Sequence, residues 1–149
     1  MSKRTSMDQD EVIIAGIGQI PVGEHWEISL RSLAVQAMRA AIDDAGGLTP
    51  GALFAANTLA PNLSRQAHIG ALLADYAGLE GIEAAAFEAG GASGGAALRQ
   101  GWLAIKSGLV DVALVVGVEK FTDSLGPELE AARSTLTDSD YESVHGLTP

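Results

Sequence analysis

Four short apolar runs alternate with segments of helical periodicity, and this alternation restricts the fold more than any other feature of the sequence. The runs predict buried strands and cover residues 11–18, 52–60, 84–89 and 111–119. The segments between them repeat apolar residues at helical spacing and cover residues 30–45, 69–78 and 93–109. We therefore predict an α/β fold in which a parallel βαβαβαβ sheet is layered with helices.

Residues that end helices and strands support this division. Ser29 is the expected N-cap of the first helix, whose apolar stripe stops at Gly46 and Gly47. Gly78 is expected to end the second helix, and Pro61 to end the second strand, which has the weaker pattern.

The pattern divides the chain into three parts. Residues 1–10 are polar and predict a flexible tail, and residues 11–123 carry the α/β core. Residues 124–149 hold acids, serines and threonines but no apolar run, which predicts a flexible segment and a sheet left incomplete at its C-terminal end. We expect part of a longer protein, or one half of a two-chain protein.

Composition excludes several classes of site. The 149 residues carry a formal net charge of −10, which argues against partners such as nucleic acid or an anionic membrane. The chain has no cysteine, and His25, His68 and His145 lack the spacing of metal ligands, so we expect no metal and no covalently bound cofactor. No apolar stretch is long enough to cross a membrane, and we expect a soluble cytoplasmic protein.

The motif "GIGQIPVG" resembles the start of a dinucleotide-binding loop. Gly16 and Gly18 fit its first two glycines, but Pro21 stands where the third glycine is needed. We therefore interpret Gly16 and Gly18 as tight-turn residues.

The stretch "FEAGGASGGAALRQG" (87–101) joins a predicted strand to a predicted helix through glycines, a junction at which α/β proteins place anion holes or nucleophiles. Gly91 to Gly95 fit the G-x-S-x-G elbow of serine hydrolases, with Ser93 as the nucleophile. Such a site needs an acid and then a histidine later in the chain, and only His145 follows. We prefer Ser93 as the N-cap of the helix and keep the esterase as an alternative.

Two charged residues follow the last predicted strand. Glu119 and Lys120 would lie at the carboxyl edge of the sheet, where open α/β proteins place their sites. They predict either the edge of a functional site or a solvated ion pair.

From Val12 to Thr137 the sequence resembles the N-terminal half of a thiolase, of the sterol-carrier and archaeal-type branch. The phrases that carry the resemblance are "GIGQIPVGEH", "SLRSLAVQAMRAAIDDAG", "NTLAPNLSRQAHIGALLADYAGL" and "FEAGGASGGAALRQGWLAIKSGLVDVALVVGVEKFTD". The segment "DSDYESVHGLTP" is similar to the start of the family's loop domain. The resemblance implies coenzyme A thioesters as substrates.

The sequence departs from the family at the position of its nucleophile. Thiolases have Glu-Ala-Ala-Cys-Ala-Ser-Gly-Gly where this chain has "EAGGASGG", so Gly91 stands in place of the acyl-accepting cysteine. Glycine keeps the backbone N–H donors of an anion hole but offers no nucleophile. The resemblance assigns that hole to five consecutive residues, Gly90, Gly91, Ala92, Ser93 and Gly94.

Two functions follow from this departure. The chain would supply part of a carbon–carbon lyase of the retro-aldolase type or of an acyltransferase, acting in lipid or steroid degradation, with a C-terminal thiolase half and a zinc-ribbon/OB-fold acyl-CoA-binding protein as partners. Alternatively, it would be a structural thiolase-like subunit or a truncated piece without catalysis.

The resemblance also implies a dimer. The family pairs its third strand across a dimer, and the matching residues are Ala84, Ala86, Phe87 and Glu88. A short, largely uncharged strand of this kind could be a sheet edge that needs covering. We therefore expect a homodimer or a hetero-assembly.

Overall fold

Three parallel strands form the centre of the computed structural model, which describes residues 11–147. The predicted tail, residues 1–10, lies outside the described residues. The central strand β1 (Ala52–Ala56) pairs with β2 (Glu83–Phe87) on one side and with β3 (Ala113–Gly117) on the other. In both pairings Ala56 lies opposite the last residue of the neighbouring strand. The carboxyl ends of all three strands therefore meet at one edge of the sheet.

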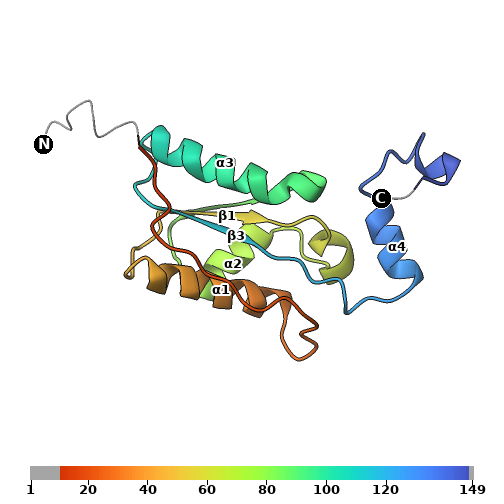
Figure 1. Ribbon diagram of the computed structural model, residues 1–149, viewed down its shortest axis with the longest axis horizontal. Coiled ribbons are helices and arrows are strands. Elements are labelled where there is room, and N and C mark those ends of the chain that lie inside the picture. Colours follow the sequence, from red (N-terminus) through yellow and green to blue (C-terminus); the bar gives the residue numbers. More distant parts are fainter. Residues whose placement is uncertain (1–10, 148–149) are drawn as a thin grey trace, which may run out of the picture.

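Helices cover both faces of this sheet (Figure 1). Helices α1 (Leu30–Asp44) and α2 (Ile69–Ala77) lie on one face, and α3 (Ser93–Lys106) lies on the other. β1 is buried from end to end, with Leu53 in the core under α1 and α2 and Phe54 in the core under α3. Phe54 meets the ring of Phe87 edge-on, with 5.8 Å between ring centroids. These layers confirm the predicted α/β class and its parallel sheet.

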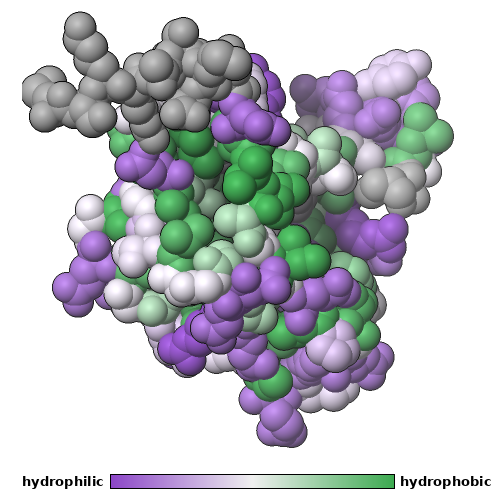
Figure 2. Space-filling model, turned by 60° about the vertical axis from the view of Figure 1, so that its left-hand side comes forward, coloured by the Kyte–Doolittle hydropathy of each residue, from purple (hydrophilic) through white to green (hydrophobic). Residues whose placement is uncertain are grey.

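The strand predicted over residues 11–18 is wrong, since this segment is extended but joins no strand in the described structure. Its backbone is held by α1 instead, because the N–H of Ile17 donates to Asp44 Oδ2 at 2.8 Å. Ile13 and Ile14 remain 72% and 75% exposed. Apolar residues are visible at the molecular surface in Figure 2.

Gly16 and Gly18 allow this segment to approach α1, and the prediction that they are tight-turn residues is wrong. A Cβ atom on Gly16 would lie 2.5 Å from the carbonyl oxygen of Ala41. A Cβ atom on Gly18 would lie 2.3 Å from the carbonyl oxygen of Ala37. Only glycine permits backbone contact this close.

The strand predicted over residues 52–60 is longer than the observed one, since β1 ends at Ala56. Although its apolar pattern is weaker, β1 is the central strand of the sheet. Leu59 is buried at the start of a π-helical turn, η1 (Ala60–Ser64), which interrupts the extended backbone. Apolar residues continue past the strand because Leu59 and Ala60, where this turn begins, are buried as well.

The predicted helix ends agree well with the structure. Ser29 caps α1, its Oγ accepting the N–H of Ser32 at 3.3 Å, and Gly78 ends α2 with a φ of 76°. α3 ends at Lys106, somewhat before the predicted residue 109. The segment after residue 124 is partly helical, with α4 (Pro127–Ser134) and a short 3-10 turn, η3 (Ser143–His145).

Gly70 gives a direct test of how closely α2 packs on the sheet. A Cβ atom there would lie 2.5 Å from the carbonyl carbon of Ala85 in β2, so we expect Gly70→Ala to lower the free energy of unfolding by about 1–3 kcal/mol. The matched change Gly95→Ala, at an exposed position of α3 with open space around it, should be neutral or stabilise by up to about 1 kcal/mol. Urea unfolding of both variants measures the two effects, and equal effects would contradict the packing argument.

Candidate functional site

A shallow hollow of about 270 Å³ lies at the carboxyl edge of the sheet. Its walls come from the ends of β1 and β3 and from the first turn of α3, and they consist of Ala56, Asn57, Thr58, Ser93, Gly94, Gly117, Val118 and Glu119. Open α/β sheets place ligands at this edge because the loops that follow parallel strands converge there. The hollow brings together residues far apart in the chain, such as Asn57 and Glu119, which are separated by 62 positions.

The glycine turn, which we define as residues 88–92, joins β2 to α3 beside this hollow. Gly90 has a φ of 55°, a conformation that favours glycine, and its N–H donates to Glu88 Oε1 at 2.6 Å. Gly91 does not have a positive φ, and a Cβ atom built on it meets nothing within 4 Å. The turn therefore has room for a side chain at position 91 that the sequence does not supply.

Ser93 is the first residue of α3 rather than its N-cap, which is Ala92. The predicted role of Ser93 as the N-cap is therefore wrong. Its Oγ accepts the N–H of Ala89 at 2.9 Å and donates to the carbonyl of Gly90 at 2.7 Å, so it binds backward to the glycine turn and not forward to the helix. The hydroxyl oxygen of Thr58 lies 2.9 Å from Ser93 Oγ.

These contacts weigh against the esterase alternative. Ser93 is only 6% exposed, and its hydroxyl already has donor and acceptor partners. The ring of His145 contacts Tyr141 instead of Ser93. Its Nδ1 lies 2.6 Å from the carbonyl oxygen of Tyr141, and the centroids of the His145 and Tyr141 rings are 4.6 Å apart. A nucleophilic serine of this type needs a histidine as its base. His145 instead contacts the backbone of Tyr141, four residues before it in the chain.

Glu119 is the acidic residue of the hollow. Oε2 accepts the backbone N–H groups of Thr58 and Leu59, each at 3.0 Å, and Oε1 accepts the side-chain amide of Asn57 at 3.0 Å. Asn57 and Thr58 are site residues that the sequence did not predict. Two polar residues directly after a buried strand would have indicated a site at the edge of the sheet. The predicted strand, 52–60, included both residues, so this indication was lost.

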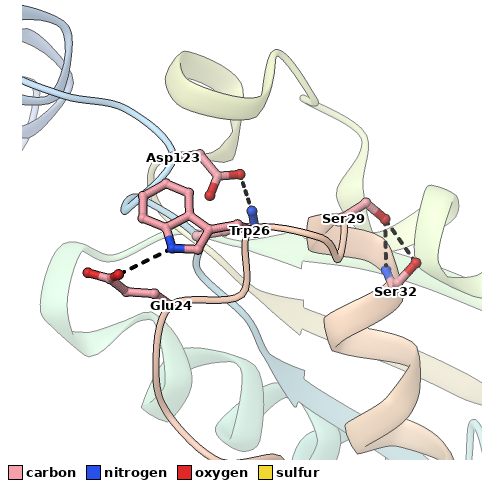
Figure 3. Close-up of polar contacts among 6 residues, drawn as sticks. Glu24, Trp26, Ser29, Ser32 and Asp123 are labelled. Carbon is pink, nitrogen blue, oxygen red and sulfur yellow. Dashed lines mark hydrogen bonds and ion pairs between the residues drawn. The ribbon is translucent and has the colours of Figure 1, made fainter.

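Lys120 lines a second hollow and not the one that Glu119 lines. The two residues, predicted to form the edge of one site, therefore lie in two. The Lys120 side chain is 7% exposed and forms an ion pair with Asp123. Its hollow measures about 480 Å³ and is lined by Ser29, Leu30, Arg31, Leu63, Ser64, Gln66, Ile69, Leu72, Lys120 and Asp123. Figure 3 shows Ser29 bonded to Ser32 at the start of α1, together with the ion pair of Asp123.

Residues 11–147 contain no group of three or more His, Cys, Asp or Glu side chains placed to hold a metal ion. None of the helices in that range has the length and apolar character needed to span a bilayer.

Sequence comparison identifies the family. The family model "Thiolase, N-terminal domain" matches residues 12–149, which is nearly the whole chain. The chain belongs to the thiolase family. The match confirms the resemblance to a thiolase N-terminal half and agrees with the layered parallel sheet.

Two archaeal thiolase relatives are similar over most of this chain. An acetyl-CoA acetyltransferase of Methanothermobacter thermautotrophicus is 39% identical over 140 residues, covering 93% of this chain and 36% of that protein. An acetyl-CoA acetyltransferase of Methanocaldococcus jannaschii is 41% identical over 140 residues, covering 93% and 35%. The chain thus spans little more than a third of the length of these relatives.

The glycine turn of this thiolase-family chain can be tested by adding one methyl group at a time. We expect Gly91→Ala to change the free energy of unfolding by less than about 0.5 kcal/mol, because the added Cβ meets open space. Gly90→Ala should destabilise by about 1–2 kcal/mol, because an alanine is strained at a φ of 55°. Thermal unfolding of the two variants checks this order, and a larger loss at position 91 would overturn the described turn geometry.

Proposed function

We propose that this chain is the N-terminal part of a thiolase-like acyl-CoA protein that works without the acyl-accepting cysteine. One observation carries the proposal: the first turn of α3, which directly follows the open glycine turn, borders a hollow at the carboxyl edge of the sheet, in a chain without cysteine. By the resemblance of "EAGGASGG" to the family's nucleophile loop, Gly91 stands at the position of that cysteine.

The site is suited to hold an oxyanion. The first turn of a helix carries N–H groups without intrahelical partners and the positive end of the helix dipole. Gly94 lines the hollow within this turn of α3, and it has no side chain to block access to the backbone. Backbone donors of this kind stabilise the negative charge that develops on a thioester oxygen.

The reaction that best suits such a site is a retro-aldol cleavage of a β-hydroxyacyl-CoA thioester. A general base removes the proton of the β-hydroxyl group, the Cα–Cβ bond breaks, and a carbonyl product leaves. The electron pair passes to the thioester oxygen as an enolate, which is then protonated at Cα. Backbone N–H groups of the first turn of α3, where Gly94 lines the hollow, would hold the enolate, and the base would come from outside this chain.

A structural role without catalysis is the second candidate. It is favoured by the division of Glu119 and Lys120 between two hollows, since Glu119 is engaged in three hydrogen bonds and Lys120 in an ion pair. Neither side chain is free to act as an acid or a base in this arrangement. In that case the chain would serve only to complete an assembly.

The proposed partners follow from the family and from the sheet. They are a C-terminal thiolase half and an acyl-CoA-binding zinc-ribbon/OB-fold protein, in a cytoplasmic pathway of lipid or steroid degradation. β2 is an edge strand of the described sheet, which supports pairing with a second copy through Ala84 to Glu88.

Thioester binding can be tested with two neighbouring glycines of α3. We expect acetyl-CoA and a longer β-hydroxyacyl-CoA to bind the purified chain, and Gly94→Asp to weaken binding at least about tenfold by placing a negative charge in the hollow. Gly95→Asp carries the same charge in the same helical turn but lies outside the lining of the hollow, so its affinity should stay near that of the parent. Calorimetric titration measures both, and binding that is absent or equally affected by the two changes would refute the proposed anion site.

The same preparation separates the two functions. When the chain is mixed with a separately expressed C-terminal thiolase half, a lyase should release a shorter CoA thioester from the β-hydroxyacyl-CoA, detected by mass spectrometry. Binding without any release would favour the structural subunit.

The proposed dimer can be tested at the β2 edge. Ala86 is exposed in β2, and we expect Ala86→Lys to shift the chain from dimer to monomer, because charges on edge strands oppose pairing. The control Thr49→Lys adds the same charge at an exposed position before β1 and should leave the mass unchanged. Light scattering at micromolar concentration gives the mass, and a parent chain that is a stable monomer would count against the dimer.

A further inference from the structure

We infer that Glu119 is a positioning residue for the glycine turn, acting across the ends of all three strands through Asn57 and Thr58. The inference rests on the proposed function, because it assigns Glu119 to the same anion site. It concerns how the site is held rather than which group reacts.

The first link joins β3 to the segment after β1. Glu119 follows β3, and its two carboxylate oxygens accept three N–H groups from Asn57, Thr58 and Leu59. Val118 adds a second connection, since its carbonyl accepts the Asn57 amide at 2.7 Å. Hydrogen bonds to a charged acceptor are stronger than neutral ones, so this segment is tied firmly to the end of β3.

The second link is made by Asn57 within the same segment. Its Oδ1 accepts the N–H of Ala60 at 2.8 Å while its Nδ2 binds Glu119 and Val118. Asn57 is 7% exposed, so losing these partners would leave polar atoms buried without hydrogen bonds. The backbone around Thr58 therefore has one well-defined position.

The third link joins Thr58 to the glycine turn. The Thr58 hydroxyl lies 3.2 Å from the carbonyl oxygen of Gly90 and 2.9 Å from Ser93 Oγ. Ser93 in turn binds the same carbonyl and the N–H of Ala89. Two hydroxyls thus hold Gly90, the residue directly before the position of the missing nucleophile.

The turn needs such support because of its composition. Glycine loses more conformational freedom on ordering than any other residue, and both Gly90 and Gly91 lie in this turn. Backbone donors stabilise an anion well only when they are already oriented before charge develops. A more mobile turn would keep its backbone N–H groups, but these groups would no longer point in one fixed direction.

The test uses a reporter thiol in the 149-residue chain, which has no cysteine of its own. Gly91→Cys introduces a single thiol where a Cβ atom has free space. The pH dependence of its alkylation by iodoacetamide gives its pKa, which is about 8.5 for an unperturbed thiol and lower beside oriented N–H donors.

Two changes are then combined with Gly91→Cys. Glu119→Gln removes the charged acceptor, and Thr58→Val removes only the hydroxyl that reaches Gly90. We expect each to raise the thiol pKa by about half a unit or more, which slows alkylation at neutral pH about threefold. Thr58→Ser should restore the parent value, because it keeps the hydroxyl.

The sign of the shift separates positioning from simple electrostatics. Removing a nearby negative charge favours a thiolate and would lower the thiol pKa, whereas disordering the donors raises it. Glu80→Gln and Thr49→Val make the same chemical changes at exposed positions that precede β2 and β1, at the opposite edge of the sheet, and should leave the pKa unchanged.

Hydrogen exchange of the peptide spanning residues 87–95 gives a second readout that does not depend on a lowered pKa. Exchange should be faster in the Glu119→Gln and Thr58→Val variants than in their controls. An ordinary thiol pKa in the parent together with faster exchange would refute the proposed anion site but support the positioning role. Folded variants with unchanged exchange, and with an unchanged or lowered pKa, would overturn the inference.

Discussion

Burial of β1 on both faces is the constraint on which the rest of the structure depends. Its five residues are buried, and successive side chains enter the core under α1 and α2 or the core under α3. A strand enclosed in this way can satisfy its backbone only through neighbouring strands, and β2 and β3 occupy the two sides. Because both pair with it in the same register, all three strands end together.

The shared edge determines which polar residues meet. The segments after β1, β2 and β3 contribute Thr58, the glycine turn and Glu119, which the hydrogen bonds join into one network. Within the described residues no buried side-chain nitrogen or oxygen lacks a partner. A network that is fully satisfied is rigid, and rigidity is what backbone donors need if they are to hold an anion.

The thiolase family and the missing cysteine together define the chemical question. In the proposed function, the start of α3 and the glycine turn hold a charged oxygen, while position 91 has space but no side chain. A site of this kind would not capture the acyl group covalently, whereas binding of a thioester or enolate needs no nucleophile. This difference is why we propose cleavage or assembly rather than acyl transfer through the enzyme.

The sequence by itself determined helices α1, α2 and α3, the α/β class and the strand–glycine–helix junction, because apolar periodicity and helix-ending residues such as Ser29 and Gly78 act locally. Helix α4 lies in the segment that was predicted to be flexible. Only the tertiary structure decided which strands pair. The run at residues 11–18 has the composition of a strand, yet Asp44 and two close glycine contacts hold it against α1.

The candidate site shows the same division. The glycine turn was predicted from a contiguous motif, whereas Thr58 and Glu119 are 61 residues apart and meet only because their strands end together. Adjacent Glu119 and Lys120 reach different hollows, and the Ser93 hydroxyl binds backward to the turn. The spacing of residues along the chain predicts helix caps and apolar periodicity. Which residues form hydrogen bonds between the ends of different strands depends on how the whole chain packs.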